Sequence, residues 1–383
     1  MHTKSIIIKN AQIVNEGITF SGDVLIEGQY IKEIASSISI KNSNVTIIDA
    51  KGNYLLPGVI DDQVHFREPG LTHKASIESE SKAAIAGGIT SFIEMPNTKP
   101  QATTIDKLED KFQIASKTSS ANYSFMFGGT NDNLDEILKV DCRKVAGLKL
   151  FLGSSTGNML VDNPEVLEKI FRSTDLLISV HCEDEDTIKQ NTSHYLSKYG
   201  ENIPIKYHPK IRSAEACYIS SSKAIALAKK TGARLHVFHL TTAKEMELFS
   251  NTKPLKDKKI TAEVCVHHLW FSDLDYETKG TFIKWNPAVK SANDAATAIG
   301  EAISGSEAAF ARRMNRTAKS LGMTRSTFKN AHGLTEKGHL STARDMTILG
   351  RHLLYDYPGY YPMFKRKTTH ASRKVRNTKL KFT

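Results

Sequence analysis

The residues with the clearest chemical potential lie in one stretch, Asp61-Asp62-Gln63-Val64-His65-Phe66-Arg67-Glu68-Pro69-Gly70. It follows an apolar run at residues 54–60 that is typical of a buried strand. Because side chains alternate along a strand, Gln63, His65 and Arg67 are predicted to share one face. A metal-binding imidazole would then lie beside a guanidinium that can hold a carboxylate. A single strand histidine is usually structural, so a site is favoured only because similar strand ends follow downstream.

From about residue 58 the chain repeats a strand–loop–helix pattern, which predicts an α/β protein of the (β/α)8-barrel type. Strands are predicted at residues 59–65, 90–95, 123–127, 147–152, 176–181, 234–239 and 260–266. Helices are predicted between them, at residues 74–86, 104–116, 164–171 and 213–230. A closed barrel of this type needs eight strands. The pattern therefore predicts a barrel that lacks strand eight.

The two ends of the chain differ from this central part. Residues 1–57 alternate short β-like runs with Asn, Gly and Ser turns, which predicts a small N-terminal β-domain. The barrel is predicted to occupy residues 58–289. Residues 290–383 are predicted to be helical, with helices at 292–303, 306–321 and 342–354.

Composition excludes several classes of protein. No apolar run is long enough to span a membrane, and the N-terminus has too short an apolar core for a signal peptide. The four cysteines lie far apart, which favours reduced thiols and a cytoplasmic protein. The net charge of +11 is concentrated in the tail, where eight Lys and Arg and no acidic residue follow from Lys365. We interpret this tail as a solvated end rather than a nucleic-acid or membrane contact, and association into a homo-oligomer stays open.

The opening stretch resembles the His-x-His-x-Arg-Glu-Pro-Gly motif of the dihydroorotases, which belong to the amidohydrolase superfamily of metal-dependent (β/α)8 barrels. Here the motif reads Gln-Val-His-Phe-Arg-Glu-Pro-Gly, so Gln63 replaces the first metal histidine. The resemblance extends to about Pro287. It implies a cyclic amide hydrolase of pyrimidine biosynthesis that opens dihydroorotate, a small-molecule substrate, to N-carbamoyl-aspartate.

The same resemblance implies a metal centre at four strand ends, formed by His65, Lys149, His181 and His239. Lys149, in Gly147-Leu148-Lys149-Leu150-Phe151, would be carbamylated and bridge two zinc ions, because a free ammonium cannot coordinate a metal. His236 and His239 should face opposite sides of a strand, and we expect His239 to point inward. The pair His267-His268 resembles a family stretch but is given no ligand role.

Substrate contacts are implied at Arg67, which would hold the dihydroorotate carboxylate, and at Asn97 and Asn286. Without the resemblance, each Asn would be read as a turn residue beside proline. The family's general base is an aspartate at the end of strand eight, in an Asp-His-Ala-Pro-His stretch that this chain lacks. No catalytic base is therefore assigned, and impaired turnover is expected.

Residues from about 290 onward resemble an internal part of the serine D-alanyl-D-alanine carboxypeptidases. Ser291-Ala292-Asn293 fits one of the elements these enzymes need, but the Ser-x-x-Lys and Lys-Thr-Gly matches fall inside the dihydroorotase-like part. We interpret those matches as chance. Three alternatives to a dihydroorotase remain: an inactive dihydroorotase-like subunit, a hydantoinase- or allantoinase-like hydrolase, and a carboxypeptidase fragment.

Overall fold

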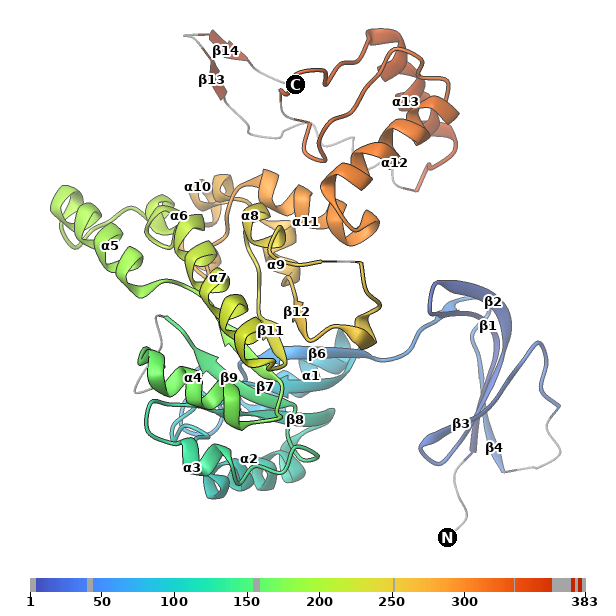
Figure 1. Cartoon of the computed structure of the whole chain (residues 1–383). Coiled ribbons are helices and arrows are strands. Elements are labelled where there is room, and N and C mark those ends of the chain that lie inside the picture. Colours follow the sequence, from blue (N-terminus) through green and yellow to red (C-terminus); the bar gives the residue numbers. More distant parts are fainter. Residues whose placement is uncertain are drawn as a thin grey trace.

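Three structured regions follow one another along the chain in the computed structural model, which describes residues 5–39, 44–153, 159–250, 252–333, 335–359, 373–375 and 378–380 (Figure 1). The first is a five-stranded sheet in the order β3-β2-β1-β4, with β5 also paired to β1. Its strands are β1 (Ser5–Asn15), β2 (Ile18–Glu27), β3 (Tyr30–Ala35), β4 (Val45–Asp49) and β5 (Tyr54–Leu55). A small core of Ala11, Ile13 and Val24 lies on one face of this sheet.

The second region is a curved sheet of seven parallel strands in the order β12-β11-β10-β9-β8-β7-β6. The strands are β6 (Val59–Val64), β7 (Ile89–Glu94), β8 (Asn122–Gly128), β9 (Gly147–Phe151), β10 (Ile178–His181), β11 (Leu235–Val237) and β12 (Ile260–Ala262). Every residue of β9 and β10 is buried, as expected for parallel strands covered on both faces. The main hydrophobic core lies around these central strands.

Helices connect the strands and cover the outside of the sheet (Figure 1). The longer ones begin at capping side chains, such as Ser76 before α1 and Thr104 before α2, which accept hydrogen bonds from the first turn. The helices of this region are α1 (Ile77–Ala86), α2 (Ile105–Thr118), α3 (Leu134–Ile137), α4 (Pro164–Ser173), α5 (Glu185–Tyr199), α6 (His208–Ile211), α7 (Ala214–Thr231), α8 (Ala243–Met246), α9 (Val266–Trp270) and α10 (Tyr276–Lys279).

The prediction of a barrel without its eighth strand is confirmed. In the part of the chain that the structure describes, β6 and β12 are the two edges of the sheet and do not pair with each other. Their carboxyl ends nevertheless approach, since the Cys265 Sγ lies 3.6 Å from the Gln63 Oε1. A side-chain contact therefore crosses the open seam at the same end where the predicted site residues lie.

Two predicted strands extend well past their observed carboxyl ends. The prediction at residues 260–266 is wrong at its end, because β12 stops at Ala262 and a helical turn begins at Val266. The turn forms because the Cys265 carbonyl accepts hydrogen bonds from the amides of His268 and Leu269. The prediction at residues 234–239 also overruns, because β11 ends at Val237 and His239 has a φ of +43°, outside the extended region.

The third region contains α11 (Ala292–Ser304), α12 (Glu307–Ser320) and α13 (Ala343–Tyr355), as the sequence predicts. Helix α11 packs against α8 and α9, and Ala298 belongs to the main core. The Ala243 amide also donates to the Asp294 Oδ1 at 2.8 Å. Thus α11 is part of the barrel's packing, whereas α12 and α13 extend away from it (Figure 1).

The basic tail lies outside the described residues except for the short strands β13 (Arg373–Val375) and β14 (Thr378–Leu380), which pair antiparallel. Within the described ranges, no helix has both the length and the apolar character needed to cross a bilayer. All four cysteines are free thiols.

A candidate metal and substrate site at the strand ends

One pocket of about 360 Å³ opens at the carboxyl ends of the parallel strands. Catalytic groups of barrel enzymes lie at this face. All seven side chains that the sequence marked line it, namely His65, Arg67, Asn97, Lys149, His181, His239 and Asn286. They come from five different strand ends and the segment after α10, so only the fold brings them together.

The two deepest histidines already lie as a pair. The His181 Nδ1 is 3.2 Å from the His239 Nε2, and both side chains are buried. Two nitrogens bound to one zinc ion at about 2.0–2.1 Å would lie roughly 3.3 Å apart in a tetrahedral arrangement. Desolvation lowers the pKa of both rings, which keeps them neutral and able to donate a lone pair.

Glu183 stands behind His181 and was not predicted. Its Oε2 lies 3.0 Å from the His181 Nε2 and also forms an ion pair with the half-buried Arg212. Burial acts to raise the pKa of Glu183, but the hydrogen bond to His181 and the Arg212 charge lower it to about 2. An ionised carboxylate on one ring nitrogen leaves the other free to bind a metal. The sequence signal was a carboxylate two residues after a strand-end histidine.

The Lys149 amine is buried in this pocket without a hydrogen bond from the described residues. Its side chain is 1% exposed, and its Nζ has no hydrogen-bond partner among the described residues. The Nζ instead lies over the rings of Phe238 and Phe151, 4.2 and 4.9 Å from their centroids. Burial lowers the pKa of Lys149 to about 7, so the neutral amine is well populated near neutral pH.

His65 is half-buried in the pocket beside Gln63, whose Nε2 lies 3.4 Å from the His65 Nε2. Burial and the charges of Arg67 and Lys149 lower the pKa of His65 to about 3. Three neutral imidazoles and a lysine amine whose pKa is lowered to about 7 fit a metal centre. The Gln63 amide oxygen would be a weaker zinc ligand than an imidazole.

Arg67 and Asn97 also line a second pocket of about 510 Å³ beside the first. Three further cations, Lys74, Lys99 and Lys107, line this second pocket, and no Asp or Glu occurs among its described lining residues. The Asn97 Oδ1 is buried without a partner in the described chain. The approach to the site is therefore positively charged and retains a free hydrogen-bond acceptor.

The main pocket offers no carboxylate to act as a base. None of its lining residues within the described ranges is Asp or Glu, and Glu183 faces His181 from behind. Cys265, His267 and His268 line the side of the pocket next to the open seam. No role was predicted for these three residues.

The residues that match carboxypeptidase motifs do not come together in one site. The Ser291 hydroxyl caps α11 and bonds to the Asp294 carboxylate at 2.5 Å. Ser79 and Lys82, which form a Ser-x-x-Lys match, lie in α1. Gly232, the last residue of the Lys-Thr-Gly match, ends α7 in the left-handed conformation. These positions belong to three separate elements, and each has a structural explanation.

Comparison with known proteins gives two family matches. A family model described as dihydro-orotase-like matches residues 52–246, and one described as D-alanyl-D-alanine carboxypeptidase matches residues 283–383. Both matches agree with the resemblances stated from the sequence.

Individual relatives point the same way. A dihydroorotase of Staphylococcus epidermidis is 34% identical over 294 residues, covering 75% of this chain and 67% of that protein. A dihydroorotase of Methanosphaera stadtmanae is 31% identical over 292 residues, covering 76% and 65%. The chain thus spans about two thirds of the length of these relatives.

Among solved structures, the L-hydantoinase (dihydropyrimidinase) of Arthrobacter aurescens is similar, with a TM-score of 0.72 and 26% identity. That match covers 77% of this chain and 66% of the hydantoinase.

Proposed function

The chain belongs to the dihydro-orotase-like family, and on that basis we propose that it binds metal and hydrolyses dihydroorotate to N-carbamoyl-aspartate. The observation that carries the proposal is the convergence of seven separately marked side chains on one pocket. In the reaction, water adds to a ring amide carbonyl carbon, the carbon–nitrogen bond breaks, and the nitrogen takes up a proton. The reverse reaction closes the ring.

His65, His181, His239 and a carbamylated Lys149 are proposed to hold two zinc ions. The neutral Lys149 amine can attack carbon dioxide, form a nitrogen–carbon bond and release one proton, which leaves a carboxylate where an unpartnered amine stood. Metal ions held in this way lower the pKa of a bound water and polarise a carbonyl. Glu183 fixes the His181 ring, since it accepts from the nitrogen that faces away from His239.

Arg67 is proposed to hold the substrate carboxylate, with Asn97 and Asn286 bonding to the ring amides. The choice of dihydroorotate over a neutral hydantoin rests on charge. Arg67 lies between the metal side of the pocket and a second pocket lined by three lysines, which favours an anionic substrate.

Turnover is expected to be slow. A positioned general base typically contributes about 10²- to 10⁴-fold to rate, and no carboxylate among the described lining residues is available for that role. This observation also favours a second candidate function, an inactive dihydroorotase-like subunit that keeps the fold and the metal ligands but has no activity.

The test is hydrolysis of dihydroorotate by the purified full chain, with and without added zinc and bicarbonate. Zinc-dependent ring opening that is lost in Lys149→Met supports the proposed reaction. A folded chain that binds zinc but gives no turnover refutes the hydrolase and leaves the inactive subunit. Hydrolysis of a neutral hydantoin in preference to dihydroorotate refutes the substrate assignment alone.

A further inference from the structure

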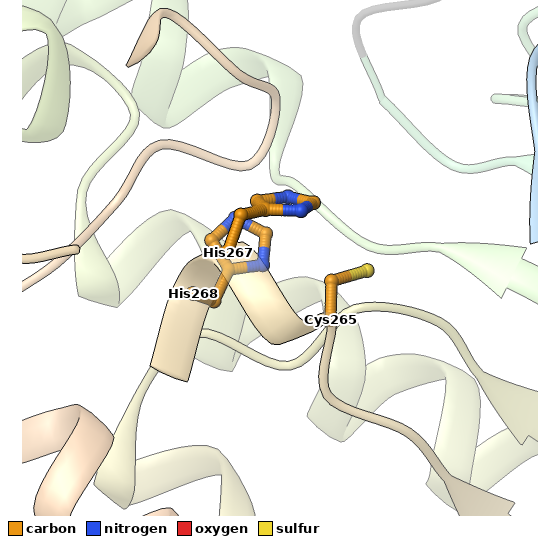
Figure 2. A group of neighbouring side chains, drawn as sticks. All are labelled: Cys265, His267 and His268. Carbon is orange, nitrogen blue, oxygen red and sulfur yellow. The ribbon is translucent and has the colours of Figure 1, made fainter. Parts of the chain in front are cut away.

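We propose that Cys265, His267 and His268 form a second metal-binding site, suited to Zn²⁺, at the turn between β12 and α9. One ligand atom from each residue lies within 4.8 Å of the other two. Figure 2 shows the three side chains rising from this one turn. None of them belongs to the centre assigned above, and the site does not require the chain to hydrolyse dihydroorotate.

The backbone of the turn places Cys265 and His268 together. The Cys265 carbonyl accepts a hydrogen bond from the His268 amide at 3.0 Å, which begins a helical turn. Residues three apart on such a turn are neighbours on its surface. Cys265 occupies the position before α9 but makes no capping hydrogen bond with its side chain, so its sulfur is not engaged in holding the helix.

His268 is already arranged as a ligand. Its Nε2 lies 3.1 Å from the Pro287 carbonyl oxygen, which can only accept, so the ring proton resides on Nε2. The Nδ1 is then the nitrogen with a free lone pair. It is buried, in a residue only 6% exposed, and has no partner in the part of the chain that the structure describes. A backbone carbonyl behind a ligating imidazole is the usual means of fixing its orientation.

His267 and Cys265 complete the set. The His267 ring lies 4.3 Å, centroid to centroid, from both the Trp285 and the His268 rings, which restricts its rotation. The Cys265 sulfur faces Gln63 across the open seam of the sheet at 3.6 Å. All three side chains line the same pocket, so an exogenous ligand can reach a metal bound there.

The donor types select the metal. One thiolate and two imidazoles suit zinc and leave a fourth position open, as in catalytic rather than structural zinc sites. Bonds of about 2.0–2.3 Å place tetrahedral ligands roughly 3.3–3.6 Å apart. The ligand atoms, which lie within 4.8 Å of one another, therefore need to close by up to about 1.5 Å on binding. Burial and the nearby carboxylates raise the pKa of Cys265 to about 12, so a cation must displace the thiol proton on binding.

The experiment is titration of the purified full chain with Co²⁺, a spectroscopic stand-in for zinc, followed by competition with Zn²⁺. We expect a thiolate-to-cobalt charge-transfer band in the near ultraviolet. Cys265→Ser, which changes one atom, should abolish the band, whereas Cys142→Ser at an exposed thiol should retain it. His268→Gln should weaken zinc binding by at least roughly 10- to 100-fold, the loss found even for groups that only orient a ligand.

Lys149→Met separates this site from the centre in the proposed function. That variant should lose the metal held by the family residues but keep the cobalt–thiolate band. Absence of the band from the wild-type chain, or its persistence in Cys265→Ser, overturns the site. Turnover of dihydroorotate without the cobalt–thiolate band would refute this site and leave the proposed function standing. The band without turnover would support this site and refute the proposed hydrolase.

Discussion

Replacing Lys111 by methionine should destabilise the protein strongly, because it leaves the buried Glu94 carboxylate without its partner. Lys111 on α2 and Glu94 at the end of β7 form an ion pair whose side chains are 0% and 1% exposed. The Lys111 Nζ also donates to the Met95 carbonyl at 2.9 Å. Removing one partner of a buried pair typically costs about 3–5 kcal/mol, because the remaining charge is left without compensation.

The loss of unfolding free energy in Lys111→Met should grow as pH rises. Burial raises the pKa of Glu94, and the Lys111 charge opposes that rise. In Lys111→Met the folded-state pKa of Glu94 therefore rises further above its unfolded value. A raised carboxyl pKa means that stability is lost as pH increases, by about 1.4 kcal/mol per unit between the unfolded and folded values. The variant should thus be closest to wild type near pH 5 and furthest from it near pH 8.

Urea unfolding of three variants measures this effect. Lys117→Met, at an exposed lysine on the same helix, should cost no more than about 1 kcal/mol. Glu94→Gln combined with Lys111→Met should recover most of the loss, because no buried charge remains. If the double variant is as unstable as Lys111→Met, or if the loss does not change with pH, the uncompensated charge is not the cause.

Three further outcomes are expected. Arg67→Gln should raise the KM for dihydroorotate by about 10- to 100-fold, since a charge-assisted hydrogen bond contributes about 1.5–3 kcal/mol. The same substitution should leave the KM for a neutral hydantoin nearly unchanged. Gly153→Ala should lower the unfolding free energy by about 1–3 kcal/mol, because a Cβ there would lie 1.7 Å from the Glu183 carbonyl oxygen. As a control, Gly350→Ala in α13, where a Cβ would meet open space, should be neutral or stabilising by up to about 1 kcal/mol. Metal analysis after dialysis in zinc and bicarbonate should find less zinc per chain in Lys149→Met than in wild type; equal contents would exclude a carbamate ligand.

Glu94 also links this core pair to the site. Its Oε1 accepts a hydrogen bond from the Arg67 amide at 3.2 Å, and Arg67 has a φ of +68°. A residue with a side chain rarely adopts this backbone conformation unless its surroundings hold it there. The buried carboxylate therefore helps to fix the turn from which Arg67 reaches the pocket.

Much of the architecture could be predicted from the sequence because its causes are local. The parallel strands are apolar runs, and α1, α2 and α7 begin at Ser and Thr caps that are visible in the sequence. The seven marked side chains were found by motif, and the strand ends then brought them together. Glu183 was missed because its hydrogen bond to His181 and its ion pair with Arg212, which lies 29 positions away, form only in the fold.

The Cys265 cluster shows where periodicity misleads. If residues 260–266 were one strand continuing to the histidines, Cys265 and His267 would share a face and His268 would point to the other. The chain instead turns into a helix at Val266, and one helical turn brings positions 265 and 268 side by side. Over so short a run, the spacing of the residues cannot distinguish the period of two of a strand from the period of 3.6 of a helix. The decision comes from the Cys265 carbonyl, which bonds forward to His268, and from Pro287, whose carbonyl holds the His268 ring. Ligand sets that form at such a change of period are therefore found from the fold rather than from sequence motifs.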